Sequence, residues 1–183
     1  MRELSMHILD LAQNSIVANA TLIEIEVIAD TVADTLKIAI RDNGKGMSAE
    51  FLARIEDPFT TTRTTRRVGL GIPMFAEAAH SCDGDLAVQS KQGKGTTVEA
   101  TFKLSHIDRA PLGDIASTLI ALIAANPDID IVYKQQVDAT EFTLDTREIK
   151  AQLDGVPINE GAVLKWLGDF MIEGTSSDTA IDR

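Results

Sequence analysis

The stretch "LIEIEVIADTVADTLKIAIRDNGKGM", residues 22–47, contains the pattern that decides the fold. Apolar and polar residues alternate through residues 22–29 and again through residues 36–42, which is the period of a strand with one buried face. The two runs therefore predict a half-buried hairpin, and the glycine-rich segment "DNGKGM" follows its second strand directly. The residues expected to point to one side are Ile23, Ile25, Val27, Leu36, Ile38 and Ile40.

The elements around this hairpin predict the fold class. Apolar residues at helical spacing and the positions of glycine and proline mark helices on both sides of it, and a second hairpin follows. The order is that of an α/β (α+β) two-layer sandwich, because strands and helices do not alternate as they do in a Rossmann fold. The expected elements are a helix over residues 2–19, the first hairpin, a short helix from Ser48 to Ile55, a helix from Ile72 to Gly84 and a second hairpin over residues 85–104.

The chain beyond about Ser105 is expected to form a separate small α/β layer. It contains a helix over 112–125, strands over 129–135 and 141–144, a helix opened by Asp145 with Glu148 as its capping-box partner, and a last helix. We therefore expect a domain over residues 1–105, a C-terminal α/β subdomain over 106–174 and a disordered tail over 175–183. The last helix carries an apolar stripe, which suits a core or an interface: Val163, Trp166, Leu167, Phe170 and Met171.

Composition narrows the class of protein. The chain has 183 residues and a formal net charge of −11, which argues against nonspecific binding of nucleic acid and against docking on an anionic membrane. It has no long apolar run, so we expect a cytoplasmic protein. One cysteine and three histidines argue against a disulfide framework and a transition-metal site.

The densest basic cluster lies in "PFTTTRTTRRVGLGIP", residues 58–73, and contains Arg63, Arg66 and Arg67. A polyphosphate ligand of so acidic a protein must find local positive potential, and this cluster supplies it. The same composition also suits a solvated loop. No complete G-x-G-x-x-G or G-x-x-x-x-G-K-[ST] motif is present, so neither common phosphate-binding loop explains the glycines.

Asp10 and Asn14 lie four residues apart on the first expected helix and therefore share a face. An amide oxygen can bind a hard cation that bridges phosphates, and a nearby carboxylate can orient or deprotonate a nucleophile. The alternative is that the pair belongs to the solvated face of an amphipathic helix.

The order of these segments resembles the GHKL superfamily of ATP-binding domains, which have the Bergerat fold. "DLAQN", "DNGKGM", "PFTTTR", "GLGI" and "GKGTT" follow one another as the N, G1, F and G2 boxes and the terminal threonine do in that superfamily. Residues 57–102 closely resemble the catalytic domain of sensor histidine kinases, whereas "DLAQNSIVANATLIEIEV" is more similar to the mismatch-repair and topoisomerase branch. The resemblance covers residues 1–104 and implies a mixed sheet with helices on one face.

The resemblance implies a Mg-ATP site and assigns a role to each box. Asp10 would be the catalytic base and Asn14 the Mg²⁺ ligand, while Asp42 would accept a hydrogen bond from the adenine amino group. The threonine and arginine run would be the ATP lid, and Thr97 or Thr96 would support a bridging water. The implied ATP-binding residues are Asn14, Asp42, Gly44, Gly46, Met47, Phe59, Thr61, Thr62, Arg63, Arg66, Gly69, Leu70, Gly71, Ile72 and Thr97.

Departures from the family leave the reaction open. Asp10 stands where histidine kinases carry asparagine and where ATP-hydrolysing members and anti-sigma kinases carry the longer glutamate, and Val17 replaces a residue that is often polar. We expect a stand-alone ATP-binding protein without phosphoacceptor helices, in which His7 is structural or supports Asp10. Two functions remain: a signalling ATPase or protein kinase, and a nucleotide-gated module that binds a protein partner through its C-terminal subdomain.

Overall fold

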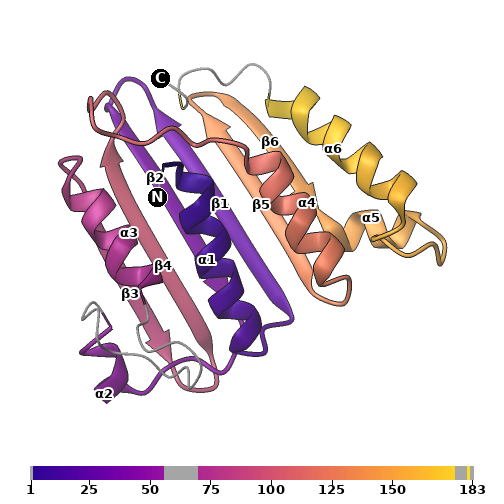
Figure 1. Cartoon of the computed structure of the whole chain (residues 1–183), viewed down its shortest axis with the longest axis horizontal. Helices are drawn as coiled ribbons and strands as arrows, with labels where there is room; N and C mark the ends of the chain where they lie inside the picture. The colour runs from indigo at the N-terminus through magenta and orange to yellow at the C-terminus, as the bar shows by residue number, and fades with distance from the viewer. Residues whose placement is uncertain (1, 56–69, 176–180, 182–183) are drawn as a thin grey trace.

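The chain folds into one sheet with helices packed on it, as the computed structural model of residues 2–55, 70–175 and 181 shows (Figure 1). The helices are α1 (Leu4–Val17), α2 (Ala49–Leu52), α3 (Gly71–His80), α4 (Ile115–Ala125), α5 (Thr146–Gln152) and α6 (Gly161–Thr175). The strands are β1 (Leu22–Asp30), β2 (Thr35–Asp42), β3 (Asp85–Lys91), β4 (Gly95–Lys103), β5 (Asp130–Val137) and β6 (Thr140–Asp145).

The six strands form a single mixed sheet in the order β3-β4-β2-β1-β5-β6. The β1–β5 pair is parallel and the other neighbouring pairs are antiparallel. The two hairpins predicted from the alternating patterns are β1–β2 and β3–β4. The alternating pattern predicted one buried face, and the six apolar side chains that were expected on that face of β1 and β2 are all buried.

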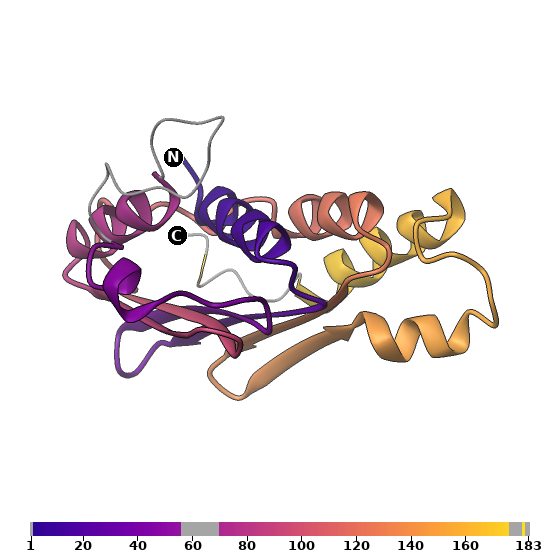
Figure 2. The same cartoon turned by 90° about the horizontal axis from the view of Figure 1, so that it is seen from below.

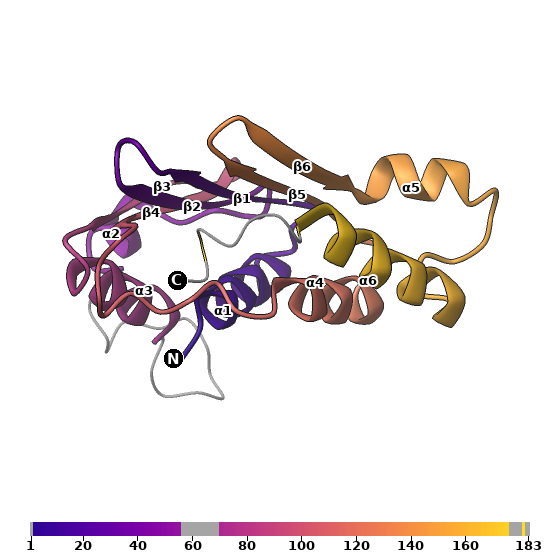
Figure 3. The same ribbon diagram turned by 90° about the horizontal axis from the view of Figure 1, so that it is seen from above.

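Helices α1, α3, α4 and α6 cover one face of the sheet, and the other face is open (Figures 2 and 3). The open face carries ion pairs between neighbouring strands, with Lys37 Nζ 2.7 Å from Glu99 Oε2 and Lys134 Nζ 2.9 Å from Glu141 Oε2. Strands with one apolar and one charged face require a single helical layer. The predicted two-layer α/β architecture with helices on one face is therefore confirmed.

The C-terminal strands do not form the separate layer that the sequence suggested. β5 pairs with β1 along its whole length, from Leu22 opposite Asp130 to Ala29 opposite Val137. β1 has a free edge once β2 has paired with its other side, and β5 satisfies the backbone groups of that edge. Helix α4 makes the crossover and packs beside α1 on the same face. The C-terminal part thus extends the first sheet, and a division into two folding units stays a proposal.

The chain end also returns to the core. Thr175 is the last residue of α6, and Ile181 is buried. The buried Arg109 side chain donates from Nη1 to the backbone oxygen of Ile181 at 2.8 Å and from Nε to that of Leu104 at 2.8 Å. Most of the tail that was expected to be disordered lies outside the described residues.

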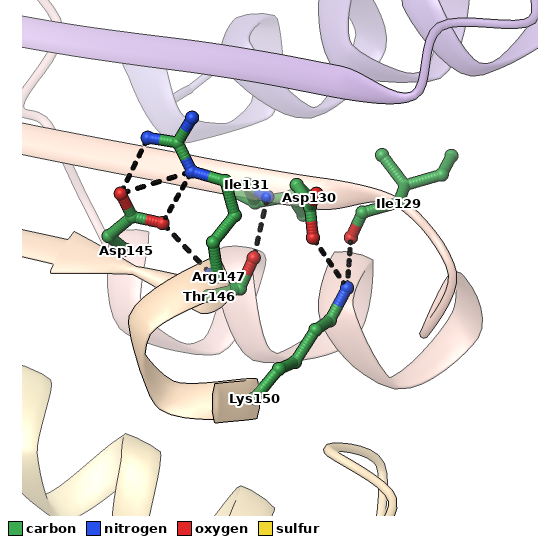
Figure 4. A network of polar contacts seen from close by, with 7 residues as sticks. All are labelled: Ile129, Asp130, Ile131, Asp145, Thr146, Arg147 and Lys150. Atoms are coloured by element: carbon green, nitrogen blue, oxygen red, sulfur yellow. Dashed lines mark hydrogen bonds and ion pairs between the residues drawn. The ribbon is translucent and has the colours of Figure 1, made fainter. Parts of the chain in front are cut away.

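Polar contacts fasten α5 to the start of β5 (Figure 4). Asp145 caps α5 by accepting from the backbone nitrogen of Arg147 at 2.9 Å. Thr146 Oγ1 accepts from the backbone nitrogen of Ile131 at 2.8 Å, and Lys150 Nζ lies 2.7 Å from Asp130 Oδ1. The end of β6 and the start of β5 are therefore held together by side chains as well as by the strand ladder.

Replacement of Ile131 tests whether the sheet unfolds as one unit. Ile131 is 1% exposed in β5, so Ile131→Ala should lower the free energy of unfolding by about 2–5 kcal/mol. The midpoint of urea unfolding should fall by the same amount when it is followed by circular dichroism and by the fluorescence of Trp166, the sole tryptophan. Val32→Ala, at a side chain 95% exposed, is the control. A fluorescence transition that moves while the dichroism transition stays would mean that the C-terminal part unfolds alone.

Candidate functional site

The first residue of α3 lies against the polar face of α1. A Cβ atom built on Gly71 would lie 2.7 Å from Asp10 Oδ2 and 3.3 Å from Asn14 Nδ2. The structure therefore brings together three residues that the sequence singled out separately. A side chain at position 71 would fill the space beside both polar groups, so glycine permits this close approach.

In the described part of the chain, the N-cap residue, Leu70, does not cap α3 with its side chain. Pro73 in the first turn has no N–H group. The N–H groups of Gly71 and Ile72 and the positive end of the helix dipole thus lie next to Asp10 and Asn14. An acid, an amide and a helix N-terminus at one place are suited to phosphate groups carried with a cation.

Asp42, the last residue of β2, is held in one orientation by two hydrogen bonds. Its Oδ2 accepts from Ser15 Oγ at 2.9 Å, and its Oδ1 accepts from the backbone nitrogen of Gly44 at 2.8 Å. Ser15 lies on α1, so this contact joins the helical layer to the sheet. Each carboxylate oxygen retains a lone pair for a further donor.

Ser15 is a site residue that sequence reasoning missed. It directly follows Asn14, and it lies on the buried stripe of α1, four residues after Leu11. A buried hydroxyl needs a hydrogen-bond partner, which was a usable signal, and the backbone oxygen of Leu11 at 3.3 Å is one partner within the helix. The other partner, Asp42, is 27 residues away in the chain and was not identifiable without the tertiary fold.

The loop after β2 fits tightly between α1 and the β3–β4 hairpin. A Cβ on Gly44 would lie 2.8 Å from the backbone oxygen of Ala18, and a Cβ on Gly46 would lie 2.1 Å from that of Lys91. Gly46 also has a φ of 63°, which disfavours residues with side chains. Both glycines of "DNGKGM" are therefore required by close packing, beyond what a tight turn would need.

Ser90 connects this loop to the second hairpin. The Ser90 hydroxyl accepts from the backbone nitrogen of Met47 at 2.9 Å and lies 3.0 Å from the backbone oxygen of Gly95. It also lies 2.9 Å from Thr96 Oγ1. A cleft of about 310 Å³ opens here, and its lining residues are Asp42, Gln89, Ser90, Lys91, Lys94, Gly95, Thr96 and Thr97.

The strand register distinguishes between the two threonines that the sequence left open. Thr96 is opposite Asp42, and Thr97 is opposite Arg41. Side chains alternate between the faces of a sheet, so Thr96 shares the face of Asp42, whereas Thr97 belongs to the open, charged face. Thr96 is therefore the threonine on the same face as Asp42, both threonines line the cleft, and the water-bridging role stays a prediction.

Part of the predicted site lies outside the described residues. This part comprises the proposed lid residues Phe59, Thr61, Thr62, Arg63 and Arg66 together with Gly69. Their roles stay predictions. Leu70 and Ile72 are described and flank Gly71 at the start of α3.

His7 is buried one turn before Asp10 and is 3% exposed. Its ring stacks on Phe75 of α3 with the ring centroids 5.1 Å apart. Burial, and to a lesser degree the charge of the chain's amino terminus, lowers the pKa of His7 to about 4. The imidazole is therefore neutral near pH 7 and serves the packing of α1 against α3. Burial also raises the pKa of the Cys82 thiol, which agrees with its expected role as a small buried side chain.

The described residues contain no group of three or more His, Cys, Asp and Glu side chains that could hold a metal ion. A magnesium ion fits the site in another way, because Mg²⁺ usually takes one or two protein oxygens and completes its shell with phosphates and water. The Asn14 side chain lies beside Asp10 and the start of α3, and its amide oxygen would be the ligand of this kind. Over the same residues, no helix is long and apolar enough to cross a membrane.

Comparison with known families gives a match over the first part of the chain. The model of a family described as histidine kinase-, DNA gyrase B-, and HSP90-like ATPases matches residues 2–106. This range contains α1, both hairpins, α3 and every residue of the candidate site. The match ends before α4.

Curated proteins that resemble the chain include sensor proteins. The chain is 38% identical over 109 residues to "Sensor protein kinase FleS" of Pseudomonas aeruginosa, which covers 59% of the chain and 26% of that protein. It is 36% identical over 109 residues to a "Putative sensor protein" of Shewanella frigidimarina, which covers 58% of the chain and 17% of that protein. The chain thus spans about a quarter or less of the length of these relatives.

Two solved structures resemble the chain at low identity. The N-terminal domain of a DNA repair protein has a TM-score of 0.49 at 16% identity, and the match covers 79% of this chain and 52% of the chain of that structure. The Aquifex aeolicus MutL ATPase domain complexed with ADP has a TM-score of 0.47 at 13% identity, and the match covers 84% of this chain and 68% of the chain of that structure.

The neutral state of His7 predicts how stability changes with pH. Between about pH 6.5 and pH 4 the unfolded chain takes up a proton at His7 and the folded chain does not, so this residue destabilises the fold as the pH falls. His7→Phe keeps an aromatic ring against Phe75 and removes the proton uptake. Urea unfolding at pH 7 and pH 4.5 should therefore show a smaller loss of stability in the variant, by on the order of 2 kcal/mol. Equal losses in both proteins would contradict the neutral, buried imidazole.

Proposed function

The chain belongs to the family of histidine kinase-, DNA gyrase B-, and HSP90-like ATPases, and on that premise we propose that it binds Mg-ATP and transfers the γ-phosphate in a regulatory role. The acceptor is water or a side chain of a partner protein. The sensor proteins among its relatives support a role in signalling. The nucleotide would lie between α1, the start of α3 and the loop that follows β2.

One observation carries the proposal: Asp42 is fixed between Ser15 and the backbone of Gly44 at the end of a strand. A carboxylate in this setting accepts hydrogen bonds and donates none, so it suits the exocyclic amino group of adenine. The cleft beside Asp42 would receive the ring, and Thr96 lies on the same face of the sheet as Asp42. Thr96 would support the water that bridges Asp42 and the base.

The triphosphate would extend from the adenine pocket to the N-terminus of α3. Backbone N–H groups at Gly71 and Ile72 can approach phosphate oxygens because position 71 has no side chain. Asn14 would place its amide oxygen on the magnesium ion. When bound, Mg²⁺ neutralises charge on the phosphate oxygens and so favours displacement at the γ-phosphorus.

Asp10 is suited to the role of general base in the same corner of the site. Its carboxylate would take the proton of a water or hydroxyl group as that oxygen forms a bond to the γ-phosphorus. The bond from the γ-phosphorus to the bridging oxygen breaks, and ADP leaves with the electron pair. Gly71 allows the Asp10 carboxylate to lie close to the first turn of α3, where the phosphates would bind.

A nucleotide-gated interaction module is the second candidate function. It is favoured by the continuity of the sheet, because β1 pairs with β2 on one side and with β5 on the other. A change at the end of β2 can therefore reach the C-terminal elements through a shared sheet. In this module ATP would be bound and not cleaved, and the C-terminal part would present the surface for a partner.

The orientation of Asp42 predicts discrimination between ATP and GTP. Guanine presents a carbonyl where adenine presents an amino group, so Asp42 would lose its donor at a cost of ~1–3 kcal/mol, or roughly 5- to 150-fold in affinity. Titration calorimetry of the wild type with both nucleotides measures the ratio.

Ser15→Ala releases one side of Asp42 and should narrow this ratio severalfold. Ser117→Ala is the matched control, because it removes a serine hydroxyl that bonds to Asp114, the N-cap residue of α4. It should leave the ratio of the two affinities unchanged. Equal affinities of the wild type for ATP and GTP would refute the role of Asp42.

Two variants on α1 distinguish chemistry from binding. Asp10→Asn keeps size and removes proton acceptance, so turnover should fall by ~10²–10⁴ while ATP affinity changes little. Asn14→Ala removes the proposed Mg²⁺ ligand, so affinity for Mg-ATP should weaken more than affinity for metal-free ADP. Gln13→Ala, on the exposed face of the same helix, is the control for helix stability.

Turnover is measured with γ-labelled ATP. The transfer of the label to water or to protein is followed with and without cell extract. A wild type that binds Mg-ATP and transfers no label under either condition would contradict the catalytic proposal. It would leave the nucleotide-gated module as the function.

A further inference from the structure

Four of the eight aromatic Phe, Tyr and Trp residues form a ladder that runs from the core to the surface of α6. Tyr133 of β5 is fully buried and contacts Phe142 of β6, with the ring centroids 6.5 Å apart. Phe142 contacts Phe170 of α6 at 5.2 Å, and Phe170 stacks on Trp166 at 5.4 Å with the rings 10° from parallel. The outermost ring is therefore supported by three others.

The outer end of this ladder is exposed. Trp166 is 52% exposed and Phe170 is 37% exposed, although Trp166 is the only tryptophan of the chain. Helix α6 forms the margin of the molecule opposite α3 (Figures 1 and 3). Large aromatic side chains that are rigid and exposed are typical of the centre of a protein interface, because they bury much area at little cost in side-chain entropy.

Acidic side chains lie directly beside the two rings. Asp169 is three residues after Trp166, and Glu173 is three residues after Phe170, so the four residues occupy neighbouring positions on the helix surface. Both acids are exposed. One basic residue, the exposed Lys165, lies four residues before Asp169, while the C-terminal segment as a whole is acidic, with 14 Asp and Glu but six Lys and Arg over residues 106–183. We call Trp166, Asp169, Phe170 and Glu173 the aromatic–acidic face of α6.

The charge of this face identifies its occupant. A symmetric dimer through α6 would bring together two chains that each carry a net charge of −11, so electrostatic repulsion disfavours a second copy as the occupant. A partner with apolar side chains next to lysine or arginine would instead satisfy both parts of the face. Because α6 presents its aromatic and acidic rows side by side over 15 residues, a second helix laid along it can match both rows.

We propose that the aromatic–acidic face of α6 is a docking site for a basic amphipathic helix of a partner protein. Trp166 and Phe170 pack against the apolar stripe of that helix, and Asp169 and Glu173 pair with its basic residues. Helix α6 lies at the opposite margin of the molecule from α3, so a docked helix would leave the start of α3 open to the nucleotide (Figure 1). The proposal does not require that the chain cleave ATP.

A pair of synthetic helices tests the charge preference. The probes are an amphipathic peptide of leucine and lysine, about as long as α6, and its twin with glutamate in place of lysine. The single tryptophan reports binding directly, because its emission shifts to the blue when a helix covers Trp166. Without nucleotide, the wild type should bind the lysine peptide roughly tenfold or more tightly than the glutamate twin.

Variants of α6 locate the binding. The double variant Asp169→Lys with Glu173→Lys should reverse the preference toward the glutamate twin. Trp166→Ala, followed by calorimetry, should weaken binding of the lysine peptide by roughly tenfold. Ile107→Ala removes a 94% exposed apolar side chain away from α6 and should leave the affinity unchanged. Circular dichroism of each variant checks that the fold is intact.

Three results would overturn the proposal. The first is equal binding of both peptides by the wild type, and the second is a preference for the lysine peptide that survives both α6 variants. The third is a dimer in sedimentation that Trp166→Ala dissociates, because the occupant would then be a second copy of the chain. All measurements omit nucleotide, so a failure of the ATP site leaves their outcome unaffected.

Discussion

The close approach of α3 to α1 at Gly71 is the constraint on which the candidate site depends. A Cβ at this position would lie 2.7 Å from Asp10 Oδ2, so a larger residue would displace the Asp10 carboxylate from its place beside the first turn of α3. With glycine there, the first turn of α3 meets the acid and the amide of α1. Stacking of His7 on Phe75 holds the same two helices together one turn before Asp10 on α1. The site is therefore a consequence of how two helices pack on one face of the sheet.

Much of the fold follows from local patterns in the sequence. Ile23, Ile25 and Val27 alternate with polar residues and are buried as expected, and Ser48 caps α2 by accepting from the backbone nitrogen of Phe51. The limit of such patterns is reached at long range. Strand β5 was recognised as a strand, but its parallel pairing with β1 depends on a free edge that only the assembled hairpin creates. Helix α4 begins at Ile115, later than expected, because Gly113 has a φ of 77° and Asp114 provides the N-cap.

The candidate site shows the same division between local and long-range information. Asp10, Asn14, Asp42 and Gly71 were identified from spacing and from the resemblance to a family, and the structure places the side chains of Asp10 and Asn14 beside Gly71. Ser15 and Ser90 were missed because each acts through a partner brought close by the tertiary fold. The choice between Thr96 and Thr97 required the strand register, since adjacent residues of a strand face opposite sides.

Chemical-shift mapping of the labelled protein with Mg-ADP tests the central claim most directly. The account predicts simultaneous shifts in two groups of backbone amides that are far apart in the sequence. One group surrounds the base, at Ser15, Asp42 and Gly44, and the other receives the phosphates, at Gly71 and Ile72. AMP should shift the first group and leave the second largely unchanged. Shifts confined to other parts of the chain, or no shifts in either group at saturating nucleotide, would contradict the account.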